Sequence, residues 1–461
     1  MQALTLAICW ITCLSVLNPC GAANAVVPAG AAKTDITPNY PIRLTGYGNR
    51  RTESEKVAQK IWAKALAIGS DEGDGPAVLI TVENCGMTPA IRDAVAKRLN
   101  ETAKIRSERL AVSVSHSHTA PCLTDWAPYL FGEDIPDDQQ QRIDRYTGEL
   151  IEKMVQVAVD ALANRRPAHL AWSQGTVSFA GNRRVLRNSK WAGFGEQPDG
   201  PVDHSLPILV ARETGGKLLA VVANYACHCT TLTGSFNQIS GDWSGFAQDY
   251  IENDHPGAVA LITIGCGADA NPKPRGELEH ARQHGRALAD EVARLLKAGL
   301  KPIDPNPHCQ LRKIDLPFDK LPTREQWEAK TKEQRRATAY HARKFLDRLD
   351  AGEKLPASIS YPVATWTFGD DLAIVFLGGE VVVDYAIRLK DEFDASRLWI
   401  TAYANDVPCY IASRRVLREG GYEADGSMIY YARPTRLAPP VEDLIVDSVE
   451  ELLPADYKSG S

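Results

Sequence analysis

Residues 110–121 read LAVSVSHSHTAP, an alternation of apolar and small polar residues that ends in two histidines and a proline. The alternation predicts a half-buried β-strand over 110–115, which Pro121 brings to an end. Side chains i and i+2 of an extended segment point to the same side, so we expect His116 and His118 to share one site. Imidazole nitrogens suit zinc, although two histidines at a strand end are also compatible with a polar surface.

Strand-like and helix-like segments alternate along the rest of the chain. Strand character is predicted for residues 77–82, 208–210, 218–225, 258–264 and 366–375. Helical periodicity predicts helices at residues 89–99, 139–162 and 276–298, the last ended by Gly299. This alternation predicts a layered α/β fold.

The composition limits the function classes. Of 461 residues, 44% are apolar and 24% are charged, which is ordinary for a protein with a sizeable core. The net charge is −6 and no basic stripe occurs, so a nucleic-acid partner is not expected. No segment after residue 25 is long and apolar enough to span a bilayer.

The first 25 residues differ from the rest. Residues 3–16 are almost uninterruptedly apolar, and Ala23-Asn24-Ala25 fits a small-x-small cleavage site. We expect a signal peptide at residues 1–25, a secreted or periplasmic protein, and one catalytic unit over residues 26–461. Seven cysteines follow residue 25, and an odd number leaves at least one outside any intramolecular disulfide.

Residues 323–355 are strongly charged and almost free of β-branched side chains. This pattern predicts one or two exposed helices, inserted between strands at about residues 318–356. We expect this insertion to have no catalytic role.

Two further polar side chains follow apolar runs, as His116 does. His228 follows residues 218–226, and Glu380 follows an apolar run and two glycines. Two histidines and one carboxylate at strand ends would make an open zinc set, with room for water. Three alternatives stay open: a structural role for His228, a helix-start position for Glu380, and Asp242 as an alternative carboxylate or one that orients an imidazole.

Other motifs in the sequence bear on alternative metal sites or another class of hydrolase. Cys227 and Cys229 flank His228, and they fit either soft metal ligands or small buried side chains. His280 and His284 share one helix face, but no glutamate follows His280 and the charged neighbours predict a solvated surface. No Gly-x-Ser-x-Gly elbow occurs, so a serine hydrolase is not expected.

Several short motifs resemble those of one family, the neutral (neutral/alkaline non-lysosomal) ceramidases. Residues 116–121 are similar to its H-T-H-S-G-P segment, and residues 31–38 with Gly46-Tyr47-Gly48 to its N-terminal signature. Further resemblances are Asn182-Arg183, residues 239–242, and Tyr410 with Tyr422-Glu423. The matches extend in the same order from residue 31 to about residue 425.

The resemblance implies the family's layered α/β sandwich and a single Zn²⁺ bound by His116, His228, Glu380 and Tyr410. It also implies that three catalytic side chains surround the substrate: His118, Arg183 and Tyr422. Their chemistry suits proton transfer, the holding of a polar group and the stabilisation of an oxyanion, respectively.

Two departures from the family pattern bear on the substrate. In residues 267–272 Ala270 stands at the position of a family serine, and we expect Asp269 and Asn271, together with Gly46, to contact the substrate. About forty residues follow Tyr422, so we expect the family's C-terminal immunoglobulin-like domain to be missing.

The expected function is that of a secreted zinc-dependent hydrolase that cleaves the amide bond of a small-molecule or lipid N-acyl substrate. One alternative is the same scaffold acting on a non-ceramide ester or amide. The other is a non-catalytic binding module that contains the metal only for structure.

Overall fold

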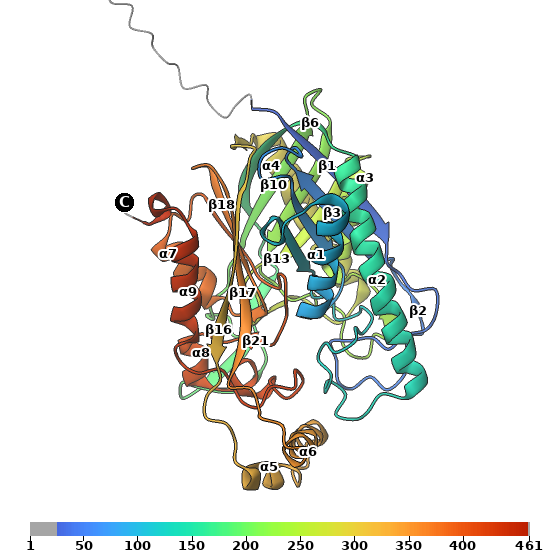
Figure 1. Cartoon of the computed structure of the whole chain (residues 1–461), viewed down its shortest axis with the longest axis vertical. Coiled ribbons are helices and arrows are strands. Elements are labelled where there is room, and N and C mark those ends of the chain that lie inside the picture. The colour runs from blue at the N-terminus through green and yellow to red at the C-terminus, as the bar shows by residue number, and fades with distance from the viewer. Residues whose placement is uncertain (1–24, 460–461) are drawn as a thin grey trace, which may run out of the picture.

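Two β-sheets lie face to face, and helices cover the outer side of each (Figure 1). The computed structural model describes residues 25–459, so the predicted signal peptide lies outside the described residues except for Ala25. The layered α/β fold predicted from the sequence is confirmed, in the form of a four-layer sandwich.

The larger sheet is mixed, with the strand order β13-β11-β10-β6-β1-β3-β4-β5, and β15 pairs with β6. Its strands are β1 (Val27–Asp35), β3 (Trp62–Ile68), β4 (Ala77–Val82), β5 (Leu110–Val114), β6 (Arg166–Thr176), β10 (Ser205–Glu213), β11 (Leu218–Tyr225), β13 (Val259–Ile264) and β15 (Lys301–Pro302).

The second sheet has the order β16-β17-β18-β20. Its strands are β16 (His308–Pro317), β17 (Ser358–Phe368), β18 (Leu372–Leu377) and β20 (Leu398–Thr401). The strand character predicted for residues 366–375 therefore belongs to two strands, because a turn at Gly369, in the left-handed region at φ 52°, separates β17 from β18.

Helices on each outer face complete the layers. The larger sheet is covered by α1 (Pro89–Ala103), α2 (Asp137–Ala163), α3 (Asp242–Asp254) and α4 (Leu278–Ala298). The second sheet is flanked by α7 (Asp384–Glu392), α8 (Arg414–Glu419) and α9 (Val441–Leu452). Short helical turns occupy Ser107–Arg109, Tyr422–Gly426 and Ala455–Tyr457. No helix within residues 25–459 is both long and apolar enough to cross a membrane.

Apolar side chains from alternate strand positions fill the space between the sheets. Leu66 and Leu209 of the larger sheet belong to the same buried cluster as Trp366 and Phe376 of the second. The opposite strand faces pack under the helices in a separate cluster. Burial of a large apolar side chain contributes about 1.5–3 kcal/mol, so these two clusters stabilise the sandwich. The strands β3, β4, β5, β11 and β18 are buried along nearly their whole length.

The charged segment between β16 and β17 forms two helices, α5 (Arg324–Lys330) and α6 (Arg336–Asp350), at one end of the molecule (Figure 1). Thr323 and Gln326 form a reciprocal capping box at the start of α5. A side chain of α6, Tyr340, donates a hydrogen bond to Asp134 at 2.7 Å. The insertion is therefore held against the loop that follows His116 and His118 in the sequence.

Four short strand pairs shape the loops at the sheet ends. They are β2 (Lys56–Val57) with β12 (Gln238–Ile239), β7 (Ala180–Asn182) with β14 (Ala270–Pro272), β8 (Arg184–Arg187) with β9 (Lys190–Phe194), and β19 (Glu380–Val381) with β21 (Tyr410–Ile411).

Candidate metal centre and pocket

The two histidine segments meet directly. His116 and His118 follow β5, and His228 follows β11. Ser117 and Cys229 form an isolated parallel bridge, in which the backbone N–H of His118 donates to the carbonyl of Cys229 at 3.2 Å. Residues more than 100 positions apart in the sequence are thus held in one place by backbone hydrogen bonds.

A carboxylate and a phenol reach the histidines from a different pair of strands. Glu380 and Tyr410 face each other as the first residues of the parallel strands β19 and β21. The N–H of Glu380 donates to the carbonyl of Cys409 at 3.0 Å. This short pairing explains how two residues thirty positions apart reach the same site.

Four buried side chains converge. Glu380 Oε2 lies 3.0 Å from His116 Nε2 and 3.1 Å from His228 Nε2. The phenol oxygen of Tyr410 lies 3.2 Å from His228 Nε2. Each of these four side chains is at most 3% exposed. Two imidazoles, a carboxylate and a phenol at these separations match the ligand chemistry of zinc.

Hydrogen bonds to the far nitrogen orient both imidazoles. His116 Nδ1 lies 2.5 Å from the carbonyl oxygen of Cys85, and His228 Nδ1 lies 2.9 Å from that of Gly267. A carbonyl oxygen only accepts, so Nδ1 carries the proton and the Nε2 lone pair faces Glu380. Ligating histidines in metal sites are oriented in the same manner.

The charge states also suit a cation. Burial, together with the nearby Arg183 guanidinium, lowers the pKa of His228 to about 3. Burial alone would raise the pKa of Glu380, but the two imidazoles outweigh it and hold that pKa well below its usual range. At neutral pH His228 is therefore uncharged and Glu380 is ionised, as metal ligands must be.

The backbone at His116 departs from the predicted extended geometry. His116 has φ 55°, in the left-handed region that non-glycine residues seldom occupy. His116 and His118 do share one site, with their Nε2 atoms 3.0 Å apart. The two side chains meet because the chain turns at His116, and not through the alternation of side chains in a strand.

A pocket of about 310 Å³ opens beside the four converging side chains. The backbone at Gly46, with φ +82°, comes so close to His118 that an added Cβ would lie 2.5 Å from its Cγ. The ring of Tyr47 packs edge-on against His118 at 4.9 Å between centroids. The pocket is lined by Gly46, Tyr47, Gly48, His118, Leu130, Arg183, Phe194, Thr230, Asn271, Arg275, Tyr410, Tyr422 and Tyr430.

Arg183 links the pocket to the converging side chains. Its Nη2 donates to the phenol oxygen of Tyr410 at 3.0 Å, and its Nη1 to Asn271 Oδ1 at 3.3 Å. Its Nε donates to Glu423 at 3.0 Å, and Glu423, which is fully buried, also pairs with Arg184. Because a buried ion pair with several hydrogen bonds holds the guanidinium in one orientation, Arg183 presents fixed donors to the pocket.

The first half of the chain matches a known family. Residues 28–267, more than half of the sequence, match the family described as "Neutral/alkaline non-lysosomal ceramidase, N-terminal". The chain belongs to this family.

Individual relatives are distant. The chain is 22% identical to the neutral ceramidase of Pseudomonas aeruginosa over 231 residues, which cover 49% of this chain and 33% of that protein. It is 23% identical to neutral ceramidase A of Dictyostelium discoideum over 269 residues, 54% of this chain and 36% of that protein. The matched part thus spans about a third of the length of these relatives.

Solved structures show the same fold. The crystal structure of the Pseudomonas aeruginosa neutral ceramidase superposes with a TM-score of 0.70 at 18% identity, covering 93% of this chain and 75% of that chain. A ceramidase complexed with C2 superposes with a TM-score of 0.68 at 16% identity, covering 93% and 76%. The four-layer arrangement is therefore that of the neutral ceramidases.

Most residues inferred from the ceramidase resemblance lie at this site. His116, His228, Glu380 and Tyr410 converge, and His118, Arg183, Tyr422, Asn271 and Gly46 line the adjoining pocket. The ring of Tyr422 lies 5.4 Å from that of Tyr410.

Two predicted carboxylates serve the scaffold instead. The Asp242 carboxylate accepts from the backbone N–H groups of Leu232 and Trp243, at 2.9 and 2.6 Å, and contacts no imidazole among the described residues. Its effect on His228 is indirect, because the Trp243 indole donates to the His228 carbonyl at 2.9 Å.

Asp269 is likewise absent from the pocket lining. Its carboxylate is fully buried and accepts from the N–H of Val383 at 2.9 Å and from Asn182 at 3.2 Å. The carbonyl of Ala270, at the position of the family serine, accepts from the N–H of His228 at 3.1 Å. In the sequence, the place of Asp269 beside a family motif predicts a substrate contact. In the fold, its carboxylate instead accepts hydrogen bonds from Val383 and Asn182.

The competing motifs take structural roles. Cys227 and Cys229 are buried, and burial raises the pKa of both thiols well above the ordinary value. His284 was expected on a solvated face but is only 4% exposed, with Nε2 2.7 Å from the carbonyl of Pro274. Its ring stacks on Phe179 at 4.5 Å, so tertiary packing overrides its charged sequence neighbours.

Sequence reasoning missed two contributors to the site. The phenol of Tyr431 donates a hydrogen bond to Glu380 Oε1, the oxygen that faces away from the imidazoles. Arg275 lines the pocket from the loop after β14. Neither residue lies in a recognisable motif, although Tyr431 follows the Tyr422-Glu423 segment by only a few residues.

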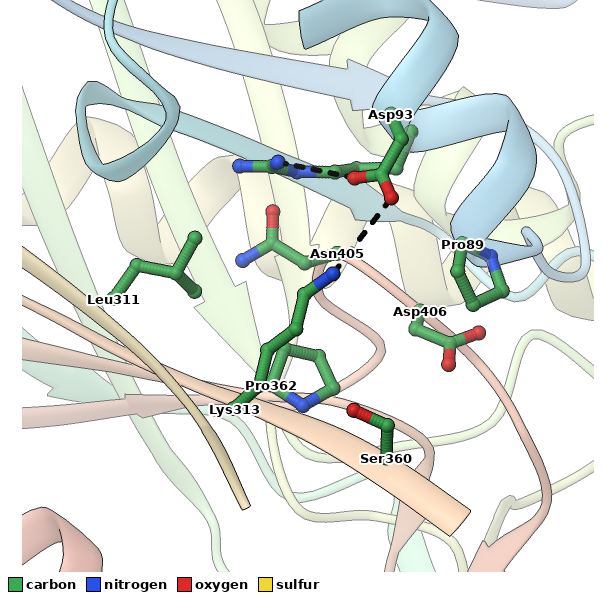
Figure 2. A pocket seen from close by; sticks show the side chains of 9 residues that line it. Pro89, Asp93, Leu311, Lys313, Ser360, Pro362, Asn405 and Asp406 are labelled. Atoms are coloured by element: carbon green, nitrogen blue, oxygen red, sulfur yellow. Dashed lines mark hydrogen bonds and ion pairs between the residues drawn. The ribbon is translucent and has the colours of Figure 1, made fainter. Parts of the chain in front are cut away.

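A second, smaller cavity lies away from this site, between α1 and the second sheet. It has a volume of about 60 Å³ and is drawn in Figure 2, where Lys313 extends toward Asp93 and Asp406 lies below Pro89. Asp406 is 4% exposed, and its Oδ1 has no hydrogen-bond partner among the described residues. Burial raises the pKa of this carboxyl to about 7.

Replacing Asp406 with asparagine is expected to stabilise the protein above neutral pH. A carboxyl whose folded pKa is raised binds its proton more tightly when folded, so wild-type stability falls as pH rises from about 4 to 7. Asparagine avoids that loss, and we expect the unfolding free energy at pH 8 to rise by about 2–4 kcal/mol. Urea unfolding at pH 4 and pH 8 measures the difference.

Asp93→Asn is the matched control, because Asp93 lines the same cavity but is half exposed. We expect it to change stability by less than about 0.5 kcal/mol. An equal gain for Asp406→Asn at both pH values would contradict the explanation.

Proposed function

We propose that the chain is a zinc-dependent hydrolase that cleaves an amide bond of an N-acyl substrate. The observation that carries this proposal is the approach of His116 Nε2 and His228 Nε2 to the same oxygen of Glu380, at 3.0 and 3.1 Å, beside a pocket. Two imidazole lone pairs and a carboxylate oxygen are all acceptors, so a cation satisfies them together. Family membership supports the same proposal.

His116, His228, Glu380 and Tyr410 would hold the metal. When bound there, Zn²⁺ would supply a Lewis acid that polarises a carbonyl and lowers the pKa of water to about 7. Tyr431 fixes the second oxygen of Glu380, and Arg183 donates to the Tyr410 oxygen. Burial raises the pKa of Tyr410 well above its usual value, and the positive charge of Arg183 offsets part of that rise. Both contacts orient the ligands before any substrate arrives.

In this proposal, His118 transfers the proton. It lines the pocket with Nε2 3.0 Å from His116 Nε2, and burial holds its pKa well below the usual value. A neutral imidazole can accept a proton from the attacking water as the new C–O bond forms. It can return that proton to the amide nitrogen as the C–N bond breaks, releasing a carboxylic acid and an amine.

In this proposal, Arg183 and Tyr422 stabilise negative charge. Both line the pocket, and the Arg183 guanidinium lies 5.8 Å from the centroid of the Tyr422 ring. Because its ion pair with Glu423 fixes Arg183, it need not reorient as charge develops on the carbonyl oxygen. Asn271 and Thr230 add polar groups for the amide itself.

Hydrolysis assays test this proposal. Ceramide, short N-acyl amides and the matching esters are offered to the purified protein with and without a zinc chelator. We expect amide hydrolysis that stops on chelation and returns with added Zn²⁺. Hydrolysis that persists in chelator, or none of any substrate after zinc is supplied, would contradict the proposal, and the second result would favour a binding module.

We also propose that the protein is exported, with cleavage after Ala25. The apolar run at residues 3–16 and the Ala23-Asn24-Ala25 site support this proposal. N-terminal sequencing of the protein recovered from its native compartment tests it, and a mature chain beginning at Val26 is the expected result.

A further inference from the structure

The pocket has an unbalanced charge. Its lining contains two arginines and one histidine but no aspartate or glutamate. Arg183 is compensated by buried Glu423, whereas Arg275 is not paired with any carboxylate in the described part of the chain. The same is true of two further arginines, Arg50 and Arg335, which contact tyrosines of the lining.

Arg275 is fixed at the pocket by its neighbours. Its Nη2 donates to the phenol oxygen of Tyr47 at 3.1 Å. On one side His284 hydrogen bonds to the carbonyl of Pro274, and on the other the N–H of Gly276 donates to Thr231 at 2.7 Å. The buried His284 therefore stabilises the turn that contains Arg275.

Arg335, from the charged insertion, contacts a tyrosine of the pocket lining. It immediately precedes α6, and its Nη2 donates to the phenol oxygen of Tyr430 at 2.8 Å. Its neighbour Arg336, by contrast, forms an ion pair with Glu133. The insertion, for which the sequence predicts no catalytic role, thus brings a guanidinium with no carboxylate partner among the described residues to a lining tyrosine.

Arg50 adds a buried positive charge behind the pocket wall. It is 4% exposed and lies 5.1 Å from the centroid of the Tyr47 ring. Its guanidinium donates to backbone carbonyls, including that of His118 at 2.6 Å, and to no carboxylate within residues 25–459. The buried cations Arg184 and Lys64 are paired with glutamates, whereas Arg43 and Arg109, like Arg50, have no carboxylate partner within residues 25–459. A positive charge behind a concave wall makes a positive contribution to the potential in the pocket.

We propose that the natural substrate carries an anionic group, a carboxylate or phosphate, which Arg275 and Arg335 bind while the amide occupies the metal centre. This inference rests on the proposed amide hydrolysis and specifies its substrate class. A guanidinium fork matches the geometry of both anions, and each arginine keeps donors beyond the one it gives to tyrosine. A neutral substrate would form no ion pair with either guanidinium, and both would stay solvated.

A matched set of substrates tests the inference. An N-octanoylglycine, an N-octanoyl-O-phosphoethanolamine and the neutral N-octanoylethanolamine are compared with the zinc-supplied full chain. We expect kcat/KM to be at least about tenfold higher for one of the anions, with a KM that rises with ionic strength. The two anions distinguish carboxylate from phosphate.

Variants assign the effect to the arginines. Arg275→Gln and Arg335→Gln are each expected to lower kcat/KM for the preferred anion by about 10- to 100-fold, mainly through KM, as removal of a charge-assisted hydrogen bond does. The loss for the neutral amide is expected to be at least about tenfold smaller. Arg343→Gln is the control, because Arg343 is also exposed and also lacks a carboxylate partner among the described residues. Unlike Arg275 and Arg335, it forms no hydrogen bond with a tyrosine of this pocket in the described part of the chain.

The outcomes distinguish a failure of the anionic-substrate inference from a failure of the proposed amide hydrolysis. Hydrolysis of the neutral amide at least as efficient as that of both anions, or equal losses for all substrates in the variants, would overturn the anionic substrate and leave amide hydrolysis standing. No hydrolysis of any probe would overturn the proposed function, and the inference with it.

Discussion

His116→Ala and His228→Ala are each expected to abolish both zinc binding and amide hydrolysis. Each variant removes one Nε2 lone pair from a buried set in which both imidazoles approach one oxygen of Glu380. The three protein ligands that remain would include a phenol and would bind zinc weakly. We therefore expect kcat/KM to fall by at least about 10⁴-fold. Elemental analysis and initial rates on the same samples measure both effects.

His308→Ala is the control for this pair. His308 is exposed at the start of β16 and belongs to neither the converging side chains nor the pocket. We expect its zinc content and rate to equal those of the wild type. A His116 or His228 variant that is free of metal yet fully active would show that the metal has no part in the chemistry.

His118→Gln is expected to lose activity while keeping its zinc. The Nε2 of His118 lies 3.0 Å from that of His116, and the proposal gives His118 a role in proton transfer and none as a metal ligand. Removal of a general acid–base group lowers kcat by about 10²–10⁴-fold. Glutamine keeps a polar side chain of similar reach, so the fold and the metal centre are expected to survive.

The zinc content of His118→Gln decides between two groupings of ligands. Cys85, His116 and His118 also lie close enough together to hold an ion, with Cys85 Sγ 3.7 Å from His116 Nδ1. If the ion bound there, His118→Gln would lose zinc and activity together. Retention of zinc with a falling kcat supports the set that contains Glu380.

The sequence predicted the parts of the site that follow long strands. His116 and His228 stand directly after apolar runs, so strand periodicity alone places them at strand ends. Tyr410 lacks such a signal, because its position depends on the two-residue pairing of β19 with β21. Only the family resemblance identified it, and no pattern identified Tyr431.

Long-range contacts also determine which polar residues face the pocket. Asp269 and Asn271 are two residues apart. The carboxylate of Asp269 nevertheless accepts a hydrogen bond from the N–H of Val383, whereas Asn271 lines the pocket. Similarly, the charged sequence around His284 predicts a solvated face, although Phe179 and Pro274 bury the ring. Periodicity describes a segment by itself and carries no information on partners a hundred or more residues away.

Titration of the metal-free protein with Zn²⁺ tests the central claim most directly. The chain is freed of metal by chelation, zinc is added in known amounts, and the rate of amide hydrolysis is followed. The proposed centre predicts no activity without zinc and a linear rise that saturates at one equivalent per chain. Activity that is undiminished in the metal-free protein, or that fails to return with zinc while the fold is intact, would contradict it.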